Sequence, residues 1–329
     1  MLSPSPSLSL LLSNLNEFRN SYDSDNTTFS PQGKLFQVEY ALEAVKQGSA
    51  AIGVRSATHA VLLTLKRSTG ELATYQKKLI RIDDHVGVAI AGLTSDARVL
   101  SNFMRQQAMR DRMTFGRAIP VGRIVQSIAD RAQTNTQEYG RRPYGVGFLV
   151  IGQDETGPHL YEFSPAGTAF EYYAHSIGAR SQSAKTYLEQ NFESFESASL
   201  AELINHGLSA LNDTLQQDKS LSVANTSVAI IGPADPAIED IQHSAAARRG
   251  YFRVWENEGV DGLLRAWRRS RGEPEDGPQE EAAPDTAAAA GETTEGQQPS
   301  AEQAQTAEGS ENAPPGAPAG GEDIDMEQH

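Results

Sequence analysis

Seven histidines and one acidic trio are the residues of this 329-residue chain best suited to bind a metal ion. The histidines are scattered, and none of their spacings is that of a metal site. The trio Asp83-Asp84-His85 contains suitable ligands, but adjacent side chains on a turn or strand do not converge on one point. His59, His85, His159 and His206 are therefore interpreted as structural or surface residues, and no metal site is expected.

Other chemistry is equally sparse in the sequence. The chain has no cysteine, which excludes disulfides, thiolate metal sites and a cysteine nucleophile. Gly145-Val-Gly147 is not a phosphate-binding loop, because neither a helix nor a Gly-Lys-Ser/Thr string follows it. No cofactor is expected.

The segment 29–49 reads as a turn followed by an amphipathic helix. Ser30-Pro31 and Gly33 are typical turn residues, and proline fixes its own φ angle. Apolar residues then recur at three- and four-residue steps, which is helical spacing. These residues are Leu35, Val38, Leu42 and Val45. Gly48 suits the C-terminal end of this helix.

Strand and helix patterns alternate in blocks after residue 49. Short β-branched segments between turn signals indicate strands, and helical spacing of apolar residues indicates helices. The expected strands are 50–55, 60–66, 78–82, 86–91, 145–152, 159–163, 168–177, 227–231 and 251–255, with a hairpin turn at 154–157. The expected helices are 95–112, 121–136, 181–192, 200–215 and about 260–269. Such blocks predict an α+β fold in which helix pairs cover two stacked sheets.

Charge is concentrated at the C-terminal end. Of the 43 acidic residues, 15 lie in 272–329, where there is no Lys or Arg, which leaves 28 against the 28 basic residues of the body. The tail 272–329 is poor in large apolar residues and is expected to be disordered, as is the Ser- and Pro-rich extension 1–17. A neutral body gives no case for binding nucleic acid. No apolar run approaches the ~20 residues of a membrane helix.

The string from Phe29 to Ser49 resembles the N-terminal signature of proteasome α-type subunits. Further strings resemble this family in the same order, and the resemblance extends from about Phe18 to Trp267. They are Lys77–Asp83, Ala91–Arg98, Arg141–Gly147 and Ser176–Ser183. The resemblance implies a four-layer αββα sandwich of the N-terminal-nucleophile hydrolase type over 18–271, with 233–250 as a probable loop insertion.

The same resemblance implies a role without catalysis. The chain is expected to be a structural and gating subunit of the 20S core, in the cytoplasm and nucleus. Its implied partners are other α subunits in a seven-membered ring, β subunits and regulatory particles or activators. The cluster Arg265, Arg268, Arg269 and Arg271 is either an import signal or, as we favour, a helix C-terminus complementing its dipole.

Five residues match functional positions of the family. Tyr22, Asp23, Pro31 and Tyr40 match the gate cluster that holds the N-terminal tails in the open form. Lys78 matches the lysine that receives the C-terminal carboxylate of a docking activator, in a pocket between neighbouring α subunits. Ser24 departs from the pattern, since most α subunits have Arg there. From the residues alone, the four gate positions read as a loop residue, a cap, a turn and a helix-packing aromatic, and Lys78 as a solvated strand-end lysine.

An enzyme is the alternative interpretation. Catalytic β subunits of this fold expose a threonine as a new N-terminus, whose amine activates its own hydroxyl. Ser49 falls at that position and Lys78 at the position of the catalytic lysine, so cleavage before Ser49 would create a candidate nucleophile. The catalytic aspartate, however, would fall near Lys66, and an uncleaved Ser49 lacks the free amine. The preceding helix also carries apolar residues that indicate its retention.

Overall fold

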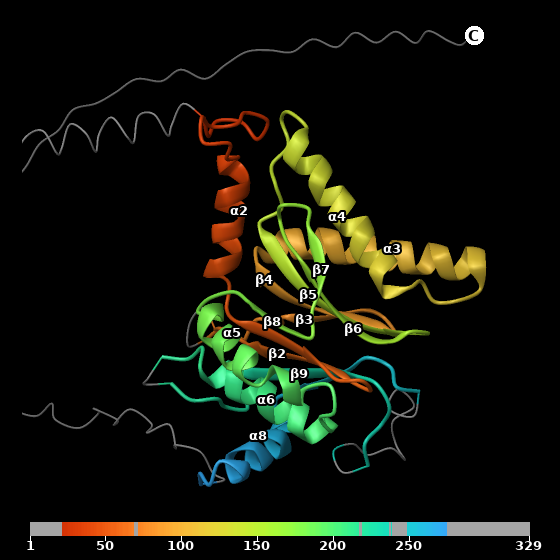
Figure 1. Cartoon of the computed structure of the whole chain (residues 1–329), viewed down its shortest axis with the longest axis vertical. Coiled ribbons are helices and arrows are strands. Elements are labelled where there is room, and N and C mark those ends of the chain that lie inside the picture. Colours follow the sequence, from red (N-terminus) through yellow and green to blue (C-terminus); the bar gives the residue numbers. More distant parts are fainter. Residues whose placement is uncertain (1–21, 69–71, 217–218, 237, 239–248, 275–329) are drawn as a thin grey trace, which may run out of the picture. The chain divides into compact units, whose positions relative to one another are not determined.

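Two antiparallel sheets form the centre of the structure, as Figure 1 shows. The computed structural model describes residues 22–68, 72–216, 219–236, 238 and 249–274. The expected extension 1–17, most of the acidic tail 272–329 and most of the insertion 233–250 lie outside these residues. Their predicted character therefore stays a prediction.

Each sheet has five strands. The first sheet has the order β10-β9-β2-β1-β8 and the second has the order β3-β4-β5-β6-β7. The strands of the first sheet are β1 (Ala51–Arg55), β2 (Ala60–Leu65), β8 (Ala174–Ile177), β9 (Thr226–Ile231) and β10 (Arg253–Glu256). Those of the second are β3 (Leu79–Asp83), β4 (Val86–Gly92), β5 (Val146–Asp154), β6 (Gly157–Phe163) and β7 (Ala169–Glu171).

Helices cover the outer face of each sheet. The helices α3 (Thr94–Phe115) and α4 (Val121–Gln137) pack on the second sheet. The helices α5 (Ser181–Gln190), α6 (Leu200–Asn212) and α8 (Glu258–Ser270) pack on the first, and the short 3-10 helix η1 (Phe192–Ser194) follows α5. The remaining helix, α2 (Phe36–Gln47), lies against β4 and β5. The predicted four-layer αββα sandwich is confirmed (Figure 1).

The inner faces of the two sheets form a separate apolar layer. Leu62, Leu149 and Leu160 are completely buried in it. Leu160 lies so close to Gly53 of β1 that a Cβ on Gly53 would come within 2.5 Å of Leu160 Cδ1. Side chains alternate between the two faces of a strand. Each sheet therefore contributes side chains both to this inner layer and to the layer beneath its own helices.

Most expected elements agree with the structure to within a few residues, but one expectation was wrong. The segment 168–177 is two strands, with β7 in one sheet and β8 in the other, so the chain changes sheets at residues 172–173. The helix expected at 200–215 ends at Asn212, three residues early. Gly48 is the C-cap of α2, as expected, although its φ of −62° is not left-handed. Glycine is required at this position because a Cβ there would lie 2.4 Å from the backbone nitrogen of Gly92.

The layer between the sheets yields a stability prediction. Leu160→Ala is expected to lower the free energy of unfolding by about 2–5 kcal/mol, because it leaves a cavity in a fully buried site. Leu72→Ala is a matched control, since that leucine is fully exposed, and it should change stability by less than about 0.5 kcal/mol. Urea unfolding of the purified variants measures both. Equal effects of the two substitutions would contradict the proposed core.

Candidate functional site

The contact between Lys78 and Ser49 is the centre of the candidate site. The Lys78 Nζ lies 2.7 Å from Ser49 Oγ and also donates a hydrogen bond to the carbonyl oxygen of Ser49. Both residues are buried, Lys78 with 4% and Ser49 with 6% of its surface exposed. The structure therefore brings together two residues that are 29 positions apart in the sequence.

Four elements place these two side chains, namely α2, β1, β3 and β4. Lys78 immediately precedes β3, and its carbonyl accepts the N–H of Ile90 in β4 at 3.1 Å. Ser49 links α2 to β1, and the carbonyl of the neighbouring Gly48 accepts the N–H of Ala179 at 2.6 Å. The close approach of Gly48 to Gly92 brings the end of α2 against the end of β4. Ser49 consequently lies beside the start of β3.

A cavity of about 260 Å³ opens at this contact. Its walls include Gly48, Ser49, Arg67, Lys78, Leu93 and Thr94. Of the described residues that line it, Lys78 and Arg67 carry charge, and none is Asp or Glu. Thr94 is the first residue of the 22-residue helix α3, whose N-terminal end favours negative charge. The cavity is therefore suited to an anion.

Burial changes the acid–base behaviour of Lys78. Its pKa is lowered from 10.5 to about 7, mainly because the charged ammonium loses its hydration in the interior, and also because the positive charge of Arg67 opposes it. Within the described part of the chain, its amine donates to the two neutral oxygens of Ser49. A bound carboxylate would supply the missing negative charge.

The same geometry bears on the enzyme interpretation. Lys78 does lie beside Ser49, as the alternative requires. Lys66 makes a different contact: its Nζ is 3.4 Å from Asn257 Oδ1, and burial lowers its pKa. Val45 of α2 belongs to the layer between the sheets, so the helix before Ser49 is part of the core. Among the described residues, none of those lining the cavity at Ser49 and Lys78 supplies a carboxylate.

Three of the four expected gate residues, Tyr22, Asp23 and Pro31, lie in the segment before α2, and the fourth, Tyr40, lies in α2 itself. Tyr40 donates a hydrogen bond from its hydroxyl to Asp23 Oδ2 at 3.0 Å. Gln37 of the same helix donates to the carbonyl oxygen of Asp23. Pro31 is exposed in a turn closed by the Gly33 N–H on the Ser30 carbonyl at 2.8 Å, and Tyr22 is half-buried. The structure therefore joins Asp23 to Tyr40 directly and fixes the segment on α2.

Two anchoring contacts were not predicted from the sequence. Asn26 is buried, and its Nδ2 donates to the carbonyls of Asn135 at 2.6 Å and Glu138 at 3.1 Å, at the end of α4. Arg142 donates to both carboxylate oxygens of Asp96, at 2.6 and 2.8 Å. This ion pair lowers the pKa of Asp96. It joins two of the strings that resemble the α subunits, Ala91–Arg98 and Arg141–Gly147.

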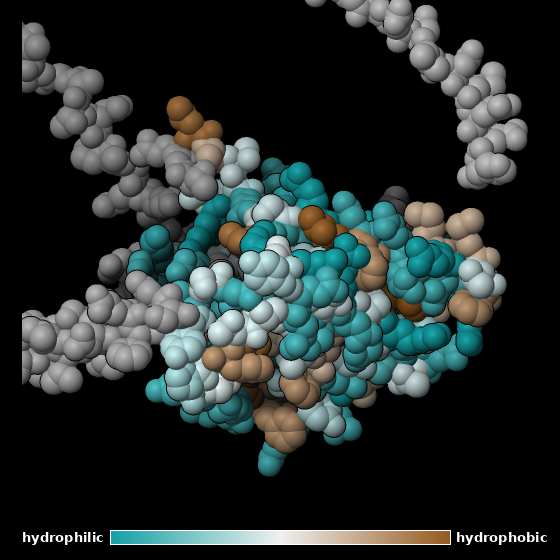
Figure 2. Space-filling model, turned by 90° about the horizontal axis from the view of Figure 1, so that it is seen from above, coloured by the Kyte–Doolittle hydropathy of each residue, from teal (hydrophilic) through white to brown (hydrophobic). Residues whose placement is uncertain are grey.

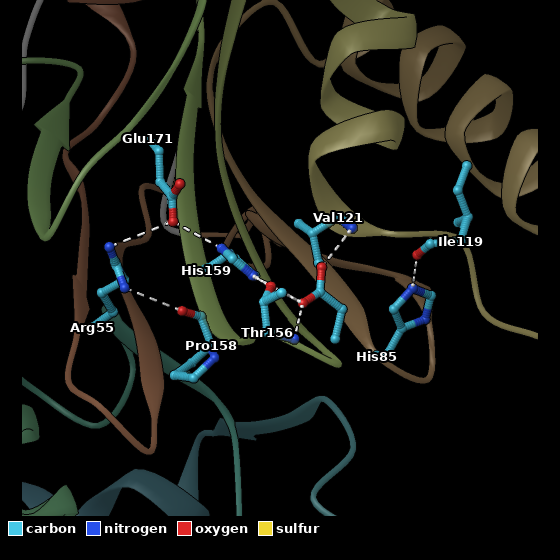
Figure 3. A network of polar contacts seen from close by, with 9 residues as sticks. Arg55, His85, Ile119, Val121, Thr156, Pro158, His159 and Glu171 are labelled. Atoms are coloured by element: carbon cyan, nitrogen blue, oxygen red, sulfur yellow. Dashed lines mark hydrogen bonds and ion pairs between the residues drawn. The ribbon is translucent and has the colours of Figure 1, made fainter.

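His85 and His159 take part in structural contacts. In Figure 3, His159 lies between two carboxylates: its Nδ1 is 2.8 Å from Glu171 Oε1 and its Nε2 is 2.9 Å from Asp154 Oδ1. The Nε2 of His85 lies 2.7 Å from the carbonyl oxygen of Ile119. No group of three or more His, Asp or Glu in the described part of the chain is placed to hold a metal ion.

Comparison with known proteins assigns the family. Residues 22–44 match the N-terminal signature of the A-type proteasome subunits, and residues 45–231 match the general proteasome family. This chain belongs to the proteasome α-subunit family. The signature covers all four expected gate residues and most of α2. Proteasome α subunits are homologous to the catalytic β subunits and are generally non-catalytic.

Similar α subunits come from several organisms. The chain is 61% identical over 215 residues to the probable alpha type-6 proteasome subunit of Schizosaccharomyces pombe, covering 65% of this chain and 79% of the relative. It is 50% identical over 242 residues to the alpha type-1 proteasome subunit of Dictyostelium discoideum, covering 73% and 96%. It is 54% identical over 221 residues to the alpha type-6 proteasome subunit of Saccharomyces cerevisiae, covering 67% and 94%.

Two further observations concern individual members of the family and the helices of this chain. The strings 43–50, 102–105 and 139–143 resemble the alpha type-1 member of the family, and relatives with that name are among the similar proteins. Of the helices that the structure describes, none combines the length and apolar character needed to span a bilayer.

The lowered pKa of Lys78 predicts a pH-dependent stability. Between about pH 7 and 10.5 the unfolded chain holds the Lys78 proton and the folded chain does not, so this residue makes stability rise with pH across that window. Below pH 7 both states hold the proton, so the full cost of burying the charged ammonium lowers the free energy of unfolding. Lys78→Met is therefore expected to stabilise the protein at pH 7, and the advantage over the unsubstituted protein should shrink toward pH 10.

Urea unfolding at pH 7, 8, 9 and 10 measures this difference. Lys77→Met is the control, because Lys77 is mostly exposed beside Glu256 and should show no such trend. If the stability difference between Lys78→Met and the unsubstituted protein stays constant from pH 7 to 10, the interpretation that folding buries an uncompensated Lys78 ammonium is contradicted.

Proposed function

We propose that this chain is a non-catalytic wall, gate and docking component of a seven-membered α ring in the 20S core. The observation that supports this most strongly is the cavity at Lys78, which has two cationic residues and no carboxylate among the described residues that line it. It lies at the end of α2, the helix that also carries the gate segment through Gln37 and Tyr40. Docking and gating would therefore act on opposite ends of one helix.

Docking would use the C-terminal carboxylate of an activator or regulatory particle. A protonated Lys78 has three N–H donors, and Ser49 accepts two of them, which leaves one for a carboxylate. Arg67 and the N-terminal end of α3 add positive potential at the same cavity. A charge-assisted hydrogen bond of this kind contributes about 1.5–3 kcal/mol.

Gating would use the residues before Pro31. They would extend toward the ring axis and help to close the substrate channel. The hydrogen bond from Tyr40 to Asp23 fixes the base of this segment on α2. Ser24 is exposed where most α subunits have Arg, so the contribution of that charge to the gate would be absent here.

Assembly into a ring is supported by the exposed surface. Figure 2 shows a mostly hydrophilic face with several separate hydrophobic areas. Large apolar side chains of α3 are exposed in the single chain, namely Val99, Met109, Met113 and Phe115. Exposed apolar groups that lie together mark protein–protein contacts, and Met109 and Met113 are one turn apart on α3. We propose the neighbouring α and β subunits as the partners, in the cytoplasm and nucleus.

The docking role of Lys78 is tested by substitution. Lys78→Ala is expected to weaken activator binding to the core about 10- to 150-fold, because it removes one charge-assisted contact. Ring assembly should survive, as judged by native mass spectrometry. Lys77→Ala is the matched control, since the neighbouring Lys77 is exposed and paired with Glu256 at 3.7 Å. Normal activator-stimulated peptide hydrolysis by the Lys78→Ala core would refute the docking role.

The gate role predicts a different response. Tyr40→Phe removes the hydroxyl that holds Asp23 but retains the ring packed against Phe36. Activator affinity should stay within about twofold, whereas stimulated peptide hydrolysis should fall, because the open position of the tail is less stable. Gln182→Ala, at an exposed position of α5, is the control. Unchanged stimulation by the Tyr40→Phe core would exclude a gate role for this contact.

The absence of catalysis is tested by intact mass. The polypeptide isolated from assembled cores should retain the residues before Ser49, since Val45 in α2 is part of the core. Ser49→Ala should leave the peptidase activity of the core unchanged. A mature chain that begins at Ser49 would instead support the hydrolase interpretation.

A further inference from the structure

The amine of Lys78 is placed to act as a nucleophile. An uncharged amine has two N–H groups, and Ser49 offers it two acceptors, the carbonyl oxygen and Oγ at 2.7 Å. When both hydrogen bonds form, the tetrahedral geometry of nitrogen directs the lone pair away from Ser49. Lys78 and Ser49 both line the cavity of about 260 Å³, which is large enough for a small reactant.

The charges around this amine favour its uncharged form. They also favour a negatively charged group in the cavity. Arg67 faces the cavity from the loop after β2. The residues of α2 and β4 that line the cavity are uncharged. In the first turn of α3, Asp96 is held by Arg142 at 2.6 and 2.8 Å and does not line the cavity. Burial, and after it the positive charge of Arg67, lower the pKa of Lys78 to about 7, so a large share of this amine is unprotonated at neutral pH.

We propose that Lys78 is a carbamylation site, at which its uncharged amine reacts reversibly with dissolved carbon dioxide. The nitrogen lone pair attacks the carbon of CO2 and forms an N–C bond, while the electron pair of one C=O π bond moves to its oxygen and gives a carboxylate. The nitrogen releases one proton to water, so the amine and CO2 yield a carbamate anion and H⁺. Arg67 and the N-terminal end of α3 would stabilise the new negative charge.

Carbamylation would reverse the charge that the cavity presents. A protonated Lys78 attracts the carboxylate of a docking partner, whereas a carbamate repels it. Dissolved CO2 would then act as an inhibitor of docking. This consequence rests on the proposed function, but the modification itself rests only on the cavity and its charges.

The experiment traps the carbamate chemically in assembled cores. Cores are equilibrated with ¹³C-labelled CO2 and bicarbonate at pH 7.4, ethylated with triethyloxonium, digested and analysed by mass spectrometry. A ¹³C-labelled ethyl carbamate is expected on Lys78 at more than tenfold the level on Lys77, which is adjacent but mostly exposed. Arg67→Gln should lower the labelling of Lys78, and Lys78→Arg should abolish it.

A second measurement separates the modification from docking. The probe is a peptide copying the C-terminus of a regulatory-particle protein, and its binding is measured with and without CO2. Half-occupancy by carbamate should weaken binding about twofold in unsubstituted cores and not in Lys78→Arg cores. Labelling of Lys78 no higher than that of Lys77 would overturn the carbamylation site, whatever the docking result. Labelling without any effect of Lys78→Ala on peptide binding would overturn the docking role alone.

Discussion

The structure depends on one constraint, the burial of the positively charged Lys78. Among the described residues that line its cavity, none supplies a negative charge. Lys78 is 4% exposed, its amine donates to the two neutral oxygens of Ser49, and it shares its cavity with Arg67. Burying an ammonium without a carboxylate costs free energy, and the lowered pKa of Lys78 expresses that cost. We propose that an anion from outside the chain, the carboxylate of a docking partner, completes this site.

The rest of the fold maintains that arrangement. The apolar layer between the sheets, with Leu149 and Leu160 fully buried, holds β1 and β4 in fixed positions. Gly48 allows α2 to end against the backbone of Gly92, where any side chain would collide. The helix that ends at the cavity of Lys78 begins near the contact of Tyr40 with Asp23. We therefore propose that α2 connects docking to gating.

The sequence predicted the layers and the order of elements, because the apolar periodicity of strands and helices is local. It did not predict that 168–177 divides between two sheets, since both halves are short extended segments and the change of sheet depends on tertiary pairing. For the site, the family strings indicated Lys78, Ser49, Asp23 and Tyr40. Arg67 was missed, because a single arginine in a loop carries no pattern. The Asp96–Arg142 pair was missed because its members are 46 positions apart.

The most direct test is an electron cryomicroscopy map of the assembled core with a docked activator. We expect continuous density for this chain through Gly48 and Ser49, and an activator C-terminal carboxylate within hydrogen-bond distance of Lys78 Nζ. A chain that starts at Ser49, or an activator terminus bound away from Lys78 and Arg67, would contradict the account.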